Sequence, residues 1–123
     1  GLGDVYKRQA LMMLKTLAGE GYCLTDEVDR LYKYDLQNDS EYCLTLYTYL
    51  MCSRSLKDTC EKLFTHRNTV LYRIRRIRED FAIDTDGTED RMRLMLSLGL
   101  ALVMQGQDEL FIQETASKRE IDG

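Results

Sequence analysis

The feature that most constrains the fold is a stripe of apolar side chains in the second half of the chain. The stripe advances by four, three and four residues, and its members are Val70, Ile74, Ile77 and Phe81. This spacing places them on one side of an α-helix. The positions opposite the stripe on a helical projection are Asn68, Tyr72, Arg75 and Glu79, and one flank holds Thr69, Arg73 and Arg76. The segment therefore predicts an amphipathic helix that docks on a core through one side and presents polar side chains on the others.

A second, shorter helix is expected directly before this one. Residues 55–58, Ser-Leu-Lys-Asp, have the spacing of a capping box, which predicts a helix over residues 56–64. Thr65 and His66 then form a tight turn, and either side chain can cap the following helix. Two helices joined by so short a turn are typical of a helix-turn-helix.

The rest of the chain also favours helices. It has 123 residues, no proline and few glycines, which suits one compact domain with helical elements. Further helices are expected over residues 10–17, from Thr25 to about residue 35, from about residue 41, and after a cap at Thr88, with a polar connector over residues 36–40. We therefore predict an all-α fold, a small helical bundle that contains a helix-turn-helix.

Positive charge is concentrated in the helix that carries the stripe. Residues 66–78 contain five arginines and no acid, whereas the whole chain has a formal net charge of −4. Three interpretations are open: a solvated helix face, a basic helix for a membrane surface or a partner protein, and the second helix of a DNA-binding helix-turn-helix. A solvated helix normally interleaves acids at a spacing of four residues, and this segment has none before Glu79. We favour duplex DNA as the partner, and the alternative is a helical protein–protein module whose arginines meet an acidic partner.

Residues 55–84, SLKDTCEKLFTHRNTVLYRIRRIREDFAID, resemble the C-terminal helix-turn-helix domain of PucR/CdaR-type transcriptional regulators. The positions that match the family pattern are Leu63, Phe64, His66, Arg67, Asn68, Thr69, Tyr72 and Arg73, and the wider resemblance covers about residues 28–104, including Tyr34-Asp35 and the run 89–91. Cys60 stands where the family usually has alanine, and Leu71 stands where a basic residue is common, which puts a contact from that position in doubt. The resemblance implies sequence-specific DNA binding as the output domain of a cytoplasmic bacterial regulator of catabolic genes, such as those for purines or sugar diacids. It also implies a homodimer in the full-length protein and a small-molecule effector bound by upstream domains.

The residues expected to contact DNA are Arg67, Asn68, Thr69, Tyr72, Arg73 and Arg76. Arginine pairs with guanine and asparagine with adenine in the major groove, while hydroxyl groups suit phosphate oxygens. Among the arginines, Arg73 and Arg76 are the preferred contacts, and Arg78 is expected near the apolar stripe, paired with an acid such as Asp80. Asn68 either reads a base or caps the helix. Tyr72 either contacts DNA or packs over a neighbouring helix.

No catalytic, metal or cofactor site is expected. The four cysteines form no Cys-x-x-Cys pair and the chain has one histidine, so a zinc site and an acid–base pair both lack a signature. The longest apolar run, residues 94–104, is too short to span a membrane as a helix, and no secretory signal is apparent. The helix after Thr88 is apolar on more than one face, so it either closes the core or adds a dimer interface.

Four segments are expected along the chain. Residues 4–9, DVYKRQ, match the translation of a transposon end used for sequencing libraries, so residues 1–9 are expected to be non-native, with the gene continuing upstream. Residues 10–36 are interpreted as a helical remnant of a preceding region, residues 37–105 as the helix-turn-helix domain, and residues 106–123 as a flexible tail.

Overall fold

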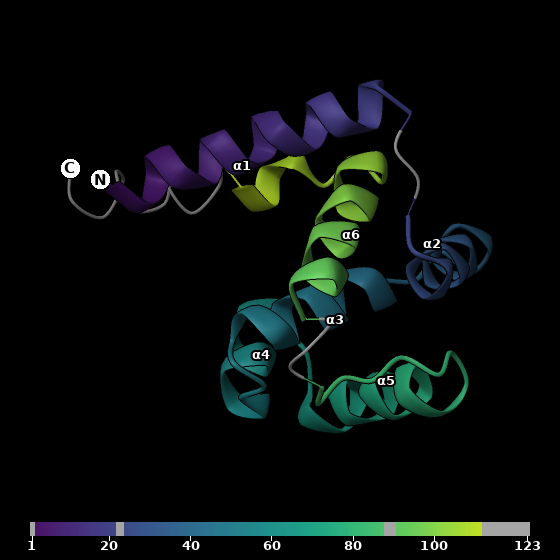
Figure 1. The fold of residues 1–123 in the computed structure, drawn as a ribbon. Helices are drawn as coiled ribbons and strands as arrows, with labels where there is room; N and C mark the ends of the chain where they lie inside the picture. The colour runs from purple at the N-terminus through teal and green to yellow at the C-terminus, as the bar shows by residue number, and fades with distance from the viewer. Residues whose placement is uncertain (1, 22–23, 88–90, 112–123) are drawn as a thin grey trace.

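The structure, a computed structural model, describes residues 2–21, 24–87 and 91–111. These residues form helices joined by short turns, with no strand among them (Figure 1). The helices are α1 (Leu2–Gly19), α2 (Asp26–Asn38), α3 (Tyr42–Met51), α4 (Leu56–Leu63), α5 (Arg67–Glu79) and α6 (Arg91–Met104), and a 3-10 turn, η1 (Asp108–Phe111), follows. The predicted all-α fold is confirmed.

The core surrounds α3, which packs against α2, α4, α5 and α6. Its fully buried side chains are Val28, Leu31, Cys43, Leu46, Val70, Ile77, Leu98, Ala101 and Leu102. The predicted stripe of α5 supplies Val70, Ile74 and Ile77 to this cluster, because the helical period brings all three to the side that faces α3. The stripe prediction is therefore confirmed for these three residues, and Phe81 packs on the edge of the cluster.

A buried carboxylate joins α2 to α3. Asp35 is 3% exposed, and its two oxygens accept the backbone N–H groups of Tyr42 at 2.8 Å and Cys43 at 2.9 Å. The hydroxyl group of Ser40 donates to the same carboxylate at 2.6 Å. The first backbone N–H groups of a helix have no partner within the helix, so Asp35 caps α3 from the preceding helix.

A second apolar cluster holds α1 against α6. Leu11 and Leu14 of α1 pack with Leu100 of α6, and Gly99 lets the two helices approach closely. A Cβ atom added at Gly99 would lie 3.1 Å from Cδ1 of Leu14. Figure 1 shows α1 at the opposite end of the molecule from α5, with α6 running between them.

Several helix boundaries differ from the sequence-based expectation. Helix α1 begins at Leu2 rather than near residue 10, so residues 2–9 continue the helix. Helix α2 runs through residues 36–38, which were expected to be a connector, and it ends where Asp39 adopts a left-handed conformation with φ 49°. Part of the expected tail forms η1, and Asp108 pairs with Lys15 of α1 at 2.7 Å. The expected cap at Thr88 and residues 112–123 lie outside the described residues.

The division of the chain at residues 36 and 37 stays a prediction. Val28 and Leu31 of α2 are fully buried in the same cluster as α3 and α5. This packing favours a folded unit that includes α2.

Candidate nucleic-acid interface

Helix α4 begins with the predicted cap. The Oγ atom of Ser55 accepts the backbone N–H of Asp58 at 3.2 Å, and Thr59 donates its hydroxyl group to the Ser55 carbonyl at 2.7 Å. The short helix ends at Leu63, one residue earlier than expected, because Phe64 adopts a left-handed conformation with φ 50° and ψ 44°. The predicted helix start and the cap by Ser55 are confirmed, whereas the backbone N–H of Ser55 donates to the Cys52 carbonyl at 3.0 Å and not to Asp58.

The turn between α4 and α5 is short, and His66 caps α5. The Nδ1 atom of His66 accepts the backbone N–H of Asn68 at 3.1 Å, while Thr65 donates its hydroxyl group to the Leu63 carbonyl at 2.9 Å. The alternative in which Asn68 caps the helix is therefore wrong, since Asn68 donates to the cap. Its side chain is exposed.

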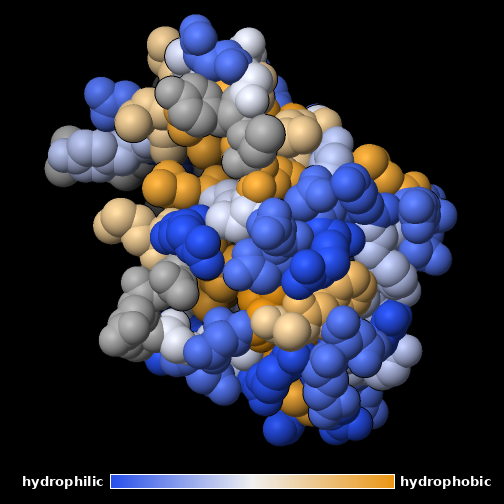
Figure 2. Space-filling view, turned by 45° about the vertical axis from the view of Figure 1, so that its right-hand side comes forward, coloured by the Kyte–Doolittle hydropathy of each residue, from blue (hydrophilic) through white to orange (hydrophobic). Residues whose placement is uncertain are grey.

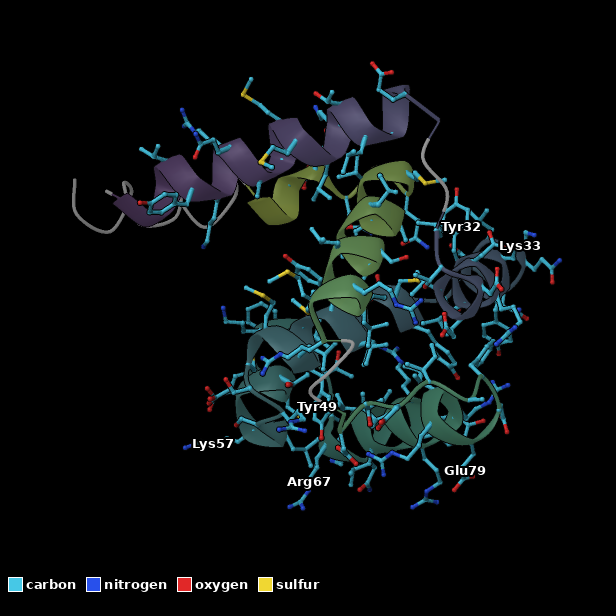
Figure 3. The ribbon with its side chains drawn as sticks, in the orientation of Figure 1. Tyr32, Lys33, Tyr49, Lys57, Arg67 and Glu79 are labelled. Atoms are coloured by element: carbon cyan, nitrogen blue, oxygen red, sulfur yellow. The ribbon has the colours of Figure 1, made fainter. Side chains whose placement is uncertain are left out.

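The outer face of α5 is defined by the exposed residues of its first nine positions, 67–75: Arg67, Asn68, Thr69, Leu71, Tyr72 and Arg75. Tyr72 is 57% exposed, and both expectations for it, contact with DNA and packing over a neighbouring helix, stay predictions. Figure 3 shows Arg67 and Glu79, which lie toward the two ends of α5, pointing away from the rest of the molecule. In the space-filling view, hydrophilic residues predominate at this end of the molecule (Figure 2). Among the described residues, Arg67 and Arg75 make no ion pair.

Arg73 is placed differently from Arg67. It is half-buried, and one terminal nitrogen donates to the Oγ1 atom of Thr45 in α3 at 3.1 Å. Thr45 is fully buried, and its hydroxyl group donates to the Glu41 carbonyl at 2.7 Å. Arg73 thus ties α5 to α3 with one donor, and four N–H donors remain on its guanidinium group.

Arg76 is more strongly held than Arg73, and the expectation that it contacts DNA stays a prediction. Its side chain is 27% exposed, and its Nε atom lies 2.9 Å from a carboxylate oxygen of Asp80. One terminal nitrogen donates to the hydroxyl oxygens of Tyr34 at 2.7 Å and Tyr42 at 3.1 Å. The hydrogen bond to Asp80 raises the pKa of Arg76, which keeps the group protonated at any relevant pH.

The two tyrosines form a platform under this arginine. Their rings stack with centroids 5.1 Å apart, and Phe81 meets the Tyr34 ring edge-on at 5.3 Å. The Arg76 guanidinium carbon lies 5.0 Å and 5.6 Å from the two tyrosine centroids, within the range of a cation–π contact. Burial raises the pKa of Tyr42. Arg76 therefore connects α5 to α2 and α3, because the platform comes from those helices.

Arg78 pairs with the loop after α5 and not with Asp80. It donates to the hydroxyl oxygen of Thr85 at 2.9 Å and 3.2 Å, and it lies 3.4 Å from a carboxylate oxygen of Asp86. Thr85 is buried, so this contact fastens the loop to the end of α5. The expectation that Arg78 pairs with an acid is confirmed, but the acid is Asp86, because Asp80 pairs with Arg76.

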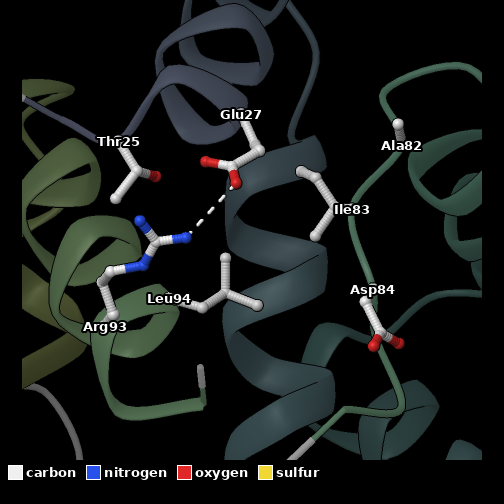
Figure 4. Close-up of a pocket in the computed structure, with 7 residues that line it drawn as sticks. All are labelled: Thr25, Glu27, Ala82, Ile83, Asp84, Arg93 and Leu94. Atoms are coloured by element: carbon white, nitrogen blue, oxygen red, sulfur yellow. Dashed lines mark hydrogen bonds and ion pairs between the residues drawn. The ribbon is translucent and has the colours of Figure 1, made fainter. Parts of the chain in front are cut away.

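A small pocket lies between α2, α6 and the segment at residues 82–84 (Figure 4). Two of its charged lining residues, Glu27 and Arg93, form an ion pair at 3.4 Å. Nearby, the backbone N–H of Thr25 donates to the hydroxyl oxygen of Ser97 at 3.0 Å. These contacts join α2 to α6, so the pocket is the seam between two packed helices.

Other kinds of site find little support in the described part of the chain. No group of three or more potential metal ligands occurs there. None of the helices described is long and apolar enough to cross a membrane. Three of the four cysteines lie in this part, and all three are free thiols: Cys43, Cys52 and Cys60.

Two residues of this region were missing from the sequence-based set. Arg75 is exposed and unpaired within the described residues, and the helical projection had already placed it opposite the stripe. Phe64 is 96% exposed, although an aromatic residue at the end of a short amphipathic helix suggests a core position. The first could have been included from the projection, whereas the second depends on the backbone conformation of the turn.

A family model and two curated proteins match part of this chain. Residues 42–100 match the model of a family described as the PucR C-terminal helix-turn-helix domain. The proline-responsive transcriptional activator PutR of Bacillus subtilis (strain 168) is 38% identical over 66 residues, which are 54% of this chain and 16% of PutR. The purine catabolism regulatory protein of the same organism is 36% identical over 62 residues, which are 50% of this chain and 12% of that protein. The match thus spans less than a fifth of either relative, and no solved structure matches the chain.

Proposed function

We propose that this chain binds duplex DNA through α5 as the output domain of a transcriptional regulator, because residues 42–100 match the model of the PucR C-terminal helix-turn-helix domain. The observation that carries this proposal is the outer face of α5. It presents Arg67, Asn68 and Arg75 to solvent, while the opposite side of the helix is buried against α3. A recognition helix needs this arrangement, because its backbone must be held rigidly while its polar side chains enter the major groove.

The outer face divides into two kinds of contact. Arg67 and Asn68 lie in the first turn of α5, which is where a recognition helix usually meets base edges. The hydroxyl groups of Thr69 and Tyr72 suit phosphate oxygens, and Arg75 adds a further cation on the same side. We assign base reading to the first pair and backbone contact to the others.

Arg73 and Arg76 take different roles in this proposal. Arg73 keeps free donors beside its bond to Thr45, so it can reach a phosphate while anchored to α3. Arg76 donates hydrogen bonds to Asp80, Tyr34 and Tyr42 within the fold. It therefore acts as a positioning residue that sets how α5 sits on α2 and α3.

The biological setting follows from the names of the two relatives, a proline-responsive activator and a purine catabolism regulator. We propose that the full-length protein controls catabolic genes in the cytoplasm and binds its operator as a homodimer. Two copies would read half-sites about one helical turn of DNA apart. A small-molecule effector would act on other domains of that protein.

The test is a binding isotherm on duplexes selected from a random pool, using two copies of this chain joined by a flexible linker. We expect Arg75→Ala to weaken binding to all sequences and to flatten the dependence of log K on log salt by about one. Arg30→Ala is the matched control, because Arg30 is an exposed arginine of α2 outside the outer face of α5. Absence of binding to any duplex at ~50 mM salt, with the helical fold intact, would reject the proposal and favour an acidic protein partner.

A further inference from the structure

Phe64 has an unusual position in the turn between α4 and α5. Its side chain is 96% exposed, so the ring buries almost no surface within the fold. Its backbone adopts a left-handed conformation with φ 50°, which a bulky side chain rarely takes and which glycine or asparagine would occupy more easily. Neither burial nor local backbone preference therefore accounts for phenylalanine at this position.

The exposed residues nearest to Phe64 in the sequence are polar. Glu61, Lys62, His66 and Arg67 are all exposed and surround it along the chain. A single aromatic ring in such surroundings is too small an apolar area for a stable protein–protein interface, which needs a contiguous patch. The ligand that fits is one with a small apolar group set among phosphates and polar base edges.

Duplex DNA offers such a group in the C5-methyl of thymine, which projects into the major groove. Phe64 lies two residues before His66, the cap of α5, and three before Arg67, so it sits at the end of α5 that would enter the groove. We propose that Phe64 is a specificity-determining residue whose ring contacts the C5-methyl group of one thymine at the edge of the site read by the first turn of α5. This inference rests on the proposed function and adds one base preference to it.

The test is a cycle of changes in protein and DNA. Each thymine of the selected duplex is replaced in turn by deoxyuridine, which removes only the methyl group, and every duplex is titrated with the parent and with Phe64→Ala. At one position, deoxyuridine should weaken the parent about fourfold, the effect of one buried methyl group. The same replacement should have no effect on Phe64→Ala, because the contact is already lost.

Two further variants separate this role from a structural one. Phe64→Gly should melt no lower than the parent, because glycine suits the left-handed backbone and no buried contact is removed. Leu36→Ala is the control for loss of an exposed apolar side chain, since Leu36 is 60% exposed on α2, outside the outer face of α5, and should bind every duplex like the parent. If the parent binds the selected duplex but no thymine couples to Phe64, the inference is overturned and the proposed function stands. If the parent binds no duplex, both are overturned.

Discussion

Replacing Asp35 should destabilise the domain more than any exposed substitution. Without the carboxylate, the backbone N–H groups of Tyr42 and Cys43 lose their acceptor inside the protein. Each buried donor left without a partner costs about 1–3 kcal/mol, so Asp35→Ala should lower the free energy of unfolding by about 2–6 kcal/mol. Ser40 adds little to this sum, because its half-buried hydroxyl group can turn to water. The loss is a large fraction of the stability of an ordinary domain.

Asp35→Asn sharpens the test, because asparagine keeps one acceptor oxygen and places an amide donor against the second N–H group. We expect a loss comparable with that of the alanine variant, because one backbone N–H group and the new amide N–H group then both lack an acceptor. Asp39→Asn is the matched control: Asp39 is exposed, and asparagine tolerates its left-handed backbone, so the change should stay within about 0.5 kcal/mol. Urea unfolding followed by far-ultraviolet circular dichroism measures all three. A loss below about 1 kcal/mol for Asp35→Ala, at unchanged m value, would refute the capping role.

Three more outcomes are expected. Arg76→Ala should lower the melting temperature, because it removes the contacts with α2 and α3, whereas Arg75→Ala should leave the melting temperature unchanged. Equal melting temperatures of the two variants would contradict the positioning role of Arg76. The Cys43 thiol is buried and burial raises its pKa, so it should resist iodoacetamide in the folded protein and react after unfolding, as read by mass spectrometry; labelling at the same rate in both states would count against its burial. Leu14→Ala should cost ~2–5 kcal/mol in unfolding free energy, and Met12→Ala, at a position 68% exposed, under ~0.5 kcal/mol; similar urea midpoints would show that α1 is not packed on α6.

The parts of the fold that depend on local sequence could be predicted. The stripe of Val70, Ile74 and Ile77 is a matter of helical period, and the cap at Ser55 is a matter of side-chain chemistry three residues from its partner. Both signals lie within a single helix or its first turn. They were sufficient to identify the helix-turn-helix and the side of α5 that is buried.

Which arginines of α5 are held by contacts within the fold, and which are exposed, could not be predicted in the same way. Arg76 is held by Tyr34, which lies 42 residues away in the sequence, and by Tyr42, which lies 34 away. A helical projection gives the direction of a side chain but not the neighbour that it meets. The same limit applies to Asp35, which entered the sequence analysis only as part of the resemblance. Its role as the cap of α3 could not be predicted, because Tyr42 and Cys43, whose N–H groups it accepts, belong to another helix.

The position of α1 has a practical consequence for experiments. Helix α1 packs on the end of α6 farthest from α5, so the start of the described chain and the proposed DNA-binding face lie at opposite ends of the molecule (Figure 1). A fluorophore or a surface tether attached near residue 5, where Val5 and Tyr6 are exposed, would leave the outer face of α5 open to solution. Immobilised protein can therefore present α5 to a flowing duplex without steric interference from the support.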